Sequence, residues 1–222
     1  MGDLRRFELD RYREHYSLNT LFETGTFHGQ GVQQALDNGF DSVYSVEIMD
    51  EFFDECVERF STNDNVTLLK GHSADLLDES LPSIDGNIFF WLDAHFPGAD
   101  GGLRDYDAES DETLRCPLEN ELRVIAKHRR GAPDVFLIDD LRIYEDGKFE
   151  NGGLPANVSR PPGANIDFVY ELFGDSHHII KLYYDEGYIL LLPIHDIPKI
   201  YARRTFWNLD GEVGRLLAKR EG

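Results

Sequence analysis

The sequence is poor in cysteine and has no long apolar run. Its two cysteines, Cys56 and Cys116, lie far apart among 222 residues. They cannot form the dense disulfide framework of a small secreted domain, so we expect free thiols in a cytoplasmic protein. No apolar run approaches the ~20 residues that cross a bilayer, and the opening MGDLRRFELDRYREHYS is too highly charged for a signal peptide. These absences argue against a secreted or membrane protein.

Basic residues are also scarce, with 22 lysines and arginines against 42 acidic residues and a net charge of −20. Such a surface repels phosphate backbones and anionic lipids, which argues against nucleic acid or a membrane as a partner. Hydrophobic residues still make up 41% of the chain, as in ordinary globular proteins. The length suits one domain with a substantial core, and we expect a single domain over residues 1–222.

Short apolar runs alternate with amphipathic segments along most of the chain, which predicts a parallel sheet covered by helices on both faces. Near the end, the residues Asp185-Glu186-Gly187 join two apolar runs within 177–194, which predicts a hairpin and an antiparallel last strand. The sequence therefore predicts an α/β fold with a seven-stranded, mostly parallel sheet. The expected strands before the hairpin are 20–27, 41–48, 65–71, 86–95 and one that begins at 134, and the expected helices are 3–16, 31–39, 50–61, 74–80, 116–130 and 165–174.

A glycine-rich segment, ETGTFHGQG, follows the first expected strand and opens the next helix. Ligands of open α/β sheets bind at the carboxyl ends of the strands, and glycines such as Gly25 let the backbone approach a ligand closely. Glu47 ends the second strand 22 residues after Gly25, where a carboxylate can accept the ribose hydroxyls of an adenosine. The glycine spacing is not G-x-G-x-x-G, and the carboxylate of Glu23 suits a ligand amine better than a pyrophosphate.

Together with YSVEI, LLKGHSADLL and the terminal hairpin, this segment resembles the class I S-adenosylmethionine-dependent methyltransferases over residues 20–195. The resemblance implies a Rossmann-like three-layer sandwich that binds S-adenosylmethionine, preceded by an N-terminal helix (1–19) and followed by a tail (196–222). The implied cofactor residues are Glu23, Gly25, Thr26, Phe27 and Gly29 around the methionine, Glu47 on the ribose, His72 and Ser73 beside the adenine, and Asp93. A solvated loop position remains the alternative for His72.

Two further apolar runs end in acidic residues. FFWLDAHFPG ends in Asp93 and His95, and VFLIDDLRIY ends in Asp139 and Asp140. In the implied fold these strands are neighbours, which brings three carboxylates together at the ligand edge. Their mutual repulsion would raise their pKa values, and a hard cation such as Mg²⁺ removes it. Adjacent residues of a strand point to opposite faces, so both Asp139 and Asp140 can be ligands only if the strand ends at about Ile138.

His95 lies two residues after Asp93, and its ordinary pKa suits the removal of a proton from a substrate hydroxyl. The pattern resembles the metal-dependent sugar O-methyltransferases of the macrocin type. That resemblance implies that Asp93, Asp139 and Asp140 bind Mg²⁺ or Mn²⁺, that His95 is the base, and that the acceptor is a hydroxyl of a sugar or glycan. It also implies cooperation with, or fusion to, glycosyltransferases. Many enzymes of this type have a tyrosine where Leu141 stands, so substrate contacts do not carry over.

Several alternatives remain open. Asp93 and Asp139-Asp140 could be ordinary turn residues and His95 a loop histidine without a role. A catechol-type O-methyltransferase and a non-catalytic domain that binds a nucleoside are the rival functions. The acidic loop 97–115 could be a lid over the site or a solvated segment, and the tail could be a docking helix or an oligomer contact.

Overall fold

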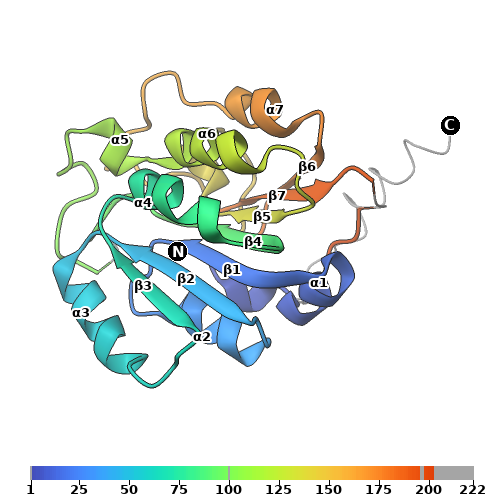
Figure 1. The fold of residues 1–222 in the computed structure, drawn as a ribbon. Helices are drawn as coiled ribbons and strands as arrows, with labels where there is room; N and C mark the ends of the chain where they lie inside the picture. The colour runs from blue at the N-terminus through green and yellow to red at the C-terminus, as the bar shows by residue number, and fades with distance from the viewer. Residues whose placement is uncertain (1, 100, 196–197, 203–222) are drawn as a thin grey trace, which may run out of the picture.

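The computed structural model describes residues 2–99, 101–195 and 198–202. The predicted tail 196–222 lies almost wholly outside the described residues. A seven-stranded sheet in the order β3-β2-β1-β4-β5-β7-β6 forms the centre of the molecule (Figure 1). Its strands are β1 (Leu18–Thr24), β2 (Ser42–Glu47), β3 (Val66–Lys70), β4 (Asn87–Leu92), β5 (Val135–Ile138), β6 (His177–Leu182) and β7 (Tyr188–Pro193).

The strand directions confirm the predicted α/β fold. The first five strands pair in parallel, and β7 pairs antiparallel with both β5 and β6. β4 and β5 are neighbours, with Leu92 paired to Ile138. The carboxyl ends of the two acid-ending strands therefore meet at one edge of the sheet, as the sequence predicts.

Helices cover both faces of the sheet and separate two apolar clusters. On one face α1, α2 and α3 cover a cluster that includes Tyr12, Val32 and Phe60, and on the other α4, α6 and α7 cover one that includes Leu77, Leu122 and Phe173 (Figure 1). No helix within the described ranges is long and apolar enough to cross a membrane. The helices are α1 (Leu9–Tyr16), α2 (Gln30–Asp37), α3 (Asp50–Arg59), α4 (Ser73–Ser80), α5 (Glu112–Arg115), α6 (Leu118–Arg129) and α7 (Asp167–Phe173), with 3-10 turns η1 (Leu4–Arg6), η2 (Leu81–Ser83) and η3 (Leu141–Ile143).

The single helix predicted over 3–16 is wrong, because the segment divides into η1 and α1 around Phe7. Phe7 lies off the apolar stripe of α1, and it packs instead edge-on against the ring of Tyr188, with 5.1 Å between the ring centres. Its backbone pairs with Ala202 in an isolated antiparallel bridge. Phe7 is therefore buried at the break between η1 and α1.

The two long loops, 93–117 and 139–166, are fastened to each other. Arg115, at the end of the unpredicted helix α5, is only 2% exposed. Its guanidinium contacts Asp107 and Glu112 at 3.2 and 3.0 Å and donates to the carbonyl oxygen of Ser159 at 2.8 Å. The hydroxyl of Ser159 donates in turn to Asp107 at 2.8 Å. The acidic loop is thus held in place by one buried cation.

Candidate active site

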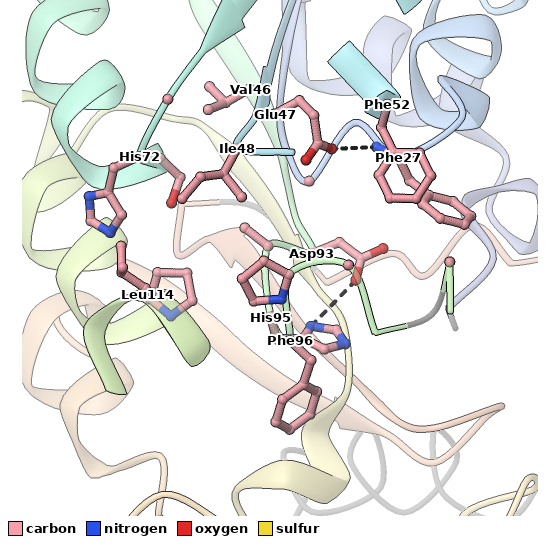
Figure 2. A pocket seen from close by; sticks show the side chains of 18 residues that line it. Phe27, Val46, Glu47, Ile48, Phe52, His72, Asp93, His95, Phe96 and Leu114 are labelled. Atoms are coloured by element: carbon pink, nitrogen blue, oxygen red, sulfur yellow. Dashed lines mark hydrogen bonds and ion pairs between the residues drawn. The ribbon is translucent and has the colours of Figure 1, made fainter. Parts of the chain in front are cut away.

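A pocket opens at the carboxyl ends of β1, β2 and β4 (Figure 2). It lies at the edge where open α/β sheets bind ligands. Aromatic and glycine residues form much of its wall, and Glu47, Asp93 and His95 supply its acidic and titratable groups. The lining comprises Gly25, Phe27, Val46, Glu47, Ile48, Phe52, Gly71, His72, Ser73, Asp93, Ala94, His95, Phe96, Pro97, Gly98, Gly101, Leu114 and Pro117.

Gly25 allows the glycine loop to lie against β4. Its φ of +88° is in the left-handed region, and a Cβ at this position would lie 2.5 Å from the carbonyl oxygen of Asp93. Such a contact is impossible for any side chain, so only glycine fits. Gly29 also has a positive φ, but a Cβ there would meet the ring of Phe60 at 2.5 Å. The structure therefore gives Gly29 a packing role below the loop rather than a place in the pocket.

Glu47 lies at the end of β2 and presents its carboxylate to the pocket, as Figure 2 shows. One oxygen accepts from the amide of Phe27 at 2.8 Å, and the other accepts from the amide of Met49 at 2.7 Å. Burial raises the pKa of this carboxyl, and the two backbone donors oppose the shift. Each oxygen keeps a second lone pair, so the side chain is fixed in position and can still accept hydrogen bonds from a diol.

Glu23 lies outside this pocket, in a second cavity on the other side of the glycine loop. Its carboxylate accepts from the hydroxyl of Ser45, which in turn lies 2.6 Å from the hydroxyl of Thr26. Burial, with the nearby charge of Glu47, raises the pKa of Glu23 to about 8. The two cavities share the wall formed by Gly25, Phe27 and Asp93, and the N-terminal residues 2–5 line the second. A ligand that spans both would bring a group to Glu23.

The residues predicted beside an adenine, His72 and Ser73, both line the first pocket at the start of α4. Ser73 is buried, while the His72 ring has a 3.3 Å contact from Nε2 to the carbonyl oxygen of Thr113 and lies 3.6 Å from Asp75. His72 thus links the pocket wall to the acidic loop. The residue has a place in the pocket wall as well as in a loop.

The polar ends of β4 and β5 form a compact cluster of ligand atoms. Asp93, His95 and Asp139 each offer one such atom, and these atoms all lie within 4.8 Å of one another. The amide of Asp139 donates to the carbonyl oxygen of Leu92 at 3.0 Å, which fixes the ends of the two strands side by side. Nδ1 of His95 lies 3.4 Å from Oδ1 of Asp93 (Figure 2).

Asp140 contacts this cluster through His95. β5 ends at Ile138, as predicted, and Asp140 takes the left-handed conformation with φ 60° and ψ 47°. Its Oδ2 lies 2.8 Å from Nε2 of His95, and its Oδ1 accepts from Nε of Arg142 at 2.7 Å. The three predicted metal carboxylates are therefore close together, but Asp140 is engaged by two cationic side chains.

The electrostatics of the cluster centre on His95. Burial disfavours the charged imidazole, but Asp140, Asp93 and Asp139 outweigh it and raise the pKa of His95 to about 10. Burial, together with the charge of Asp140, raises the pKa of Asp139 to about 6. Burial acts in the same direction on Asp140, but His95 and Arg142 hold its pKa below the usual value. In this arrangement a protonated histidine compensates the carboxylates.

Two observations show that the cluster fits a metal ion. Oδ1 of Asp139 is buried and has no hydrogen-bond partner among the described residues. An orphaned carboxylate oxygen of this kind is costly unless a ligand or an ion satisfies it. The carboxylates of Asp93 and Asp139 lie together in the cluster, and carboxylates suit Mg²⁺ and Mn²⁺.

Three neighbours of the cluster were not predicted from the sequence. The amide of Gly2 donates to Oδ2 of Asp139 at 2.8 Å, and Arg142 contacts Asp140. Glu121, near the start of α6, is buried in a small cavity that His95 and Asp139 also line. An acidic residue on the apolar stripe of a helix could have indicated Glu121, whereas no local signal marks Gly2.

No protein-family model matches this chain, and no curated protein sequence matches it. Similar solved structures include the SAH-bound methyltransferase PaMTH1 of Podospora anserina, which is 13% identical, with a TM-score of 0.57 over 83% of this chain and 76% of that one. Another is the O-methyltransferase of Bacillus cereus in complex with SAH, which is 17% identical, with a TM-score of 0.54 over 87% of this chain and 82% of that one. At such identities the similarity shows the fold, and this chain has the Rossmann-like fold of these methyltransferases.

Proposed function

We propose that this protein is an O-methyltransferase that uses S-adenosylmethionine and Mg²⁺ and acts on a hydroxyl of a sugar or glycan. The observation that carries the proposal is the cluster of Asp93, His95 and Asp139 at the edge of the pocket that Glu47 also lines. An adenosine site and a metal site thus adjoin on a fold that known methyltransferases share.

The cofactor residues divide between the two cavities. Glu47 would accept the ribose hydroxyls with the lone pairs that its backbone donors leave unused. His72 and Ser73 would lie beside the adenine. Gly25 packs against Asp93 in the wall that the two cavities share, and in the second cavity Glu23 would accept the ammonium of the methionine.

Asp93 and Asp139 would hold the metal, and Asp140 would hold His95 and Arg142 in place. When bound, S-adenosylmethionine would supply a sulfonium methyl group, and Mg²⁺ would supply a Lewis acid that lowers the pKa of a hydroxyl. His95 would accept the proton of the acceptor hydroxyl. It can do so only when neutral, and a divalent cation that shares its carboxylates would lower its pKa toward neutrality.

A specific observation favours a second candidate, a catechol-type acceptor. Phe27, Phe52 and Phe96 line the pocket that Asp93 and His95 also line, and an apolar wall of this kind suits an aromatic ring. The resemblance of the aspartate and histidine pattern to sugar O-methyltransferases favours the sugar.

Calorimetry with S-adenosylmethionine tests the cofactor site, and the absence of heat at millimolar concentrations would refute it. Transfer of a labelled methyl group to matched panels of glycosides and catechols, each with and without a chelator, then tests acceptor and metal together. Product on glycosides that disappears with chelator supports the proposal. Product on catechols alone supports the second candidate. Cofactor binding without transfer to any acceptor would indicate a non-catalytic nucleoside-binding domain.

A further inference from the structure

The N-terminal strap, which we define as residues 2–6, is fastened over the carboxyl end of β5 and the amino end of β7. The amide of Asp3 donates to the hydroxyl of Tyr188 at 2.8 Å. The guanidinium of Arg6 donates to both carboxylate oxygens of Asp185, at 2.7 and 2.6 Å. Between these anchors and the metal cluster lies Gly2, whose amide donates to Oδ2 of Asp139 at 2.8 Å.

The fit between Gly2 and Asp139 leaves no room for a side chain. A Cβ on residue 2 would lie 2.1 Å from Oδ1, 2.3 Å from Cγ and 2.5 Å from Oδ2 of Asp139. Real Cβ atoms do not approach other atoms so closely, so either the strap or the carboxylate would have to move. Asp139 is 2% exposed and its amide is bonded to Leu92. Its carboxylate therefore cannot retreat without leaving the cluster.

We propose that Gly2 is a positioning residue of the metal site, where it fixes the orientation of Asp139. Its amide donates a hydrogen bond to Oδ2 of Asp139. The other oxygen, Oδ1, has no partner among the described residues and is left for a cation. This inference rests on the proposed function, because it assigns Asp139 to a metal. Hydrogen bonds that orient a metal ligand typically change metal affinity ~10–100-fold.

The first test compares Mn²⁺ binding by the wild-type chain, Gly2→Ala and Gly153→Ala. Electron paramagnetic resonance measures the binding, without substrate or cofactor. Gly153 is exposed, and a Cβ there would meet no described atom within 4 Å. We expect Gly2→Ala to weaken Mn²⁺ binding about tenfold or more and Gly153→Ala to leave it unchanged. Equal affinity of Gly2→Ala and the wild type would overturn the proposal.

The second test does not need a metal. In chelator, Gly2→Ala should lower the unfolding midpoint by roughly 4 °C in the wild-type chain, and should have almost no effect in an Asp139→Ala background, where the added methyl group fits. A loss of the same size in both backgrounds would show that Gly2 does not act on Asp139. If the wild type binds no Mn²⁺, the proposed metal site fails, and this second comparison alone decides whether Gly2 positions the carboxylate.

Discussion

Nε2 of His95 lies 2.8 Å from Oδ2 of Asp140, and this pair decides how the cluster can work. Asp140 is the strongest of the charges that hold His95 in its protonated form. A protonated imidazole can neither ligate a metal nor accept a proton. The chemistry proposed for His95 therefore requires a second positive charge among the same carboxylates.

His95→Ala separates the two possible roles of this residue. If His95 is the base, the variant should lose roughly 10²–10⁴-fold in turnover and keep the wild-type affinity for S-adenosylmethionine and Mn²⁺. If Mn²⁺ affinity falls together with turnover, His95 is a metal ligand instead. The control is His128→Ala, because His128 lies in the last turn of α6 and pairs with Asp78, outside both cavities. Steady-state kinetics and calorimetry on the same preparations provide the comparison.

Glu47→Gln should weaken S-adenosylmethionine binding by about tenfold or more, because one ribose acceptor becomes a donor and the charge-assisted hydrogen bonds are lost. Turnover at saturating cofactor should change little. Glu51→Gln is the matched control, since Glu51 lies nearby on α3 but is exposed. Isothermal titration calorimetry measures both variants, and similar affinities for the two would remove Glu47 from the cofactor site.

Glu23 should make the stability of the ligand-free protein depend on pH. Its pKa in the folded state is about 8 because of burial, whereas an unfolded chain releases the same proton near pH ~4.3. Between these values the folded state binds more protons, so its stability falls as the pH rises, by up to about 1.4 kcal/mol per unit from this group. Glu23→Gln should remove this part of the slope. Denaturant unfolding at pH 5.5 and 8.5 tests it, and parallel slopes would contradict the assignment.

Arg115→Met should loosen the two long loops together. The variant leaves the carbonyl of Ser159 and two partly exposed carboxylates without their cation, which we expect to lower the free energy of unfolding by about 2 kcal/mol. Limited proteolysis should then cut within 97–115 faster. Arg104→Met serves as the control from the same loop, because its ion pair with Glu109 is longer, at 3.7 Å, and more exposed. Unchanged cleavage in Arg115→Met would show that the loop is held by other contacts.

The parts of the site that follow from local signals were predictable. An apolar run that ends in Asp93, and one that must turn after Ile138, identify two strand ends, and a parallel sheet brings them together. The left-handed turn that directs Asp140 to His95 and Arg142 is a packing outcome, because a carboxylate pair has no intrinsic preference for one partner. The contact between Gly2 and Asp139 joins positions 137 residues apart, and a single sequence shows no pattern at that distance.

The strap also has a consequence for the order of folding. The amide of Glu8 donates to the carbonyl oxygen of Tyr201 at 2.9 Å, and the amide of Tyr201 donates to the hydroxyl of Tyr12. These contacts close a loop of almost the whole described chain, so they form late and slowly compared with local ones. The strap's own anchors, Asp185 and Tyr188, likewise leave the ribosome only after the sheet through β5 can form, so the strap acquires them late. Completion of the metal site would then be among the last events of folding, which makes Mn²⁺ binding a sensitive probe of the fully folded chain.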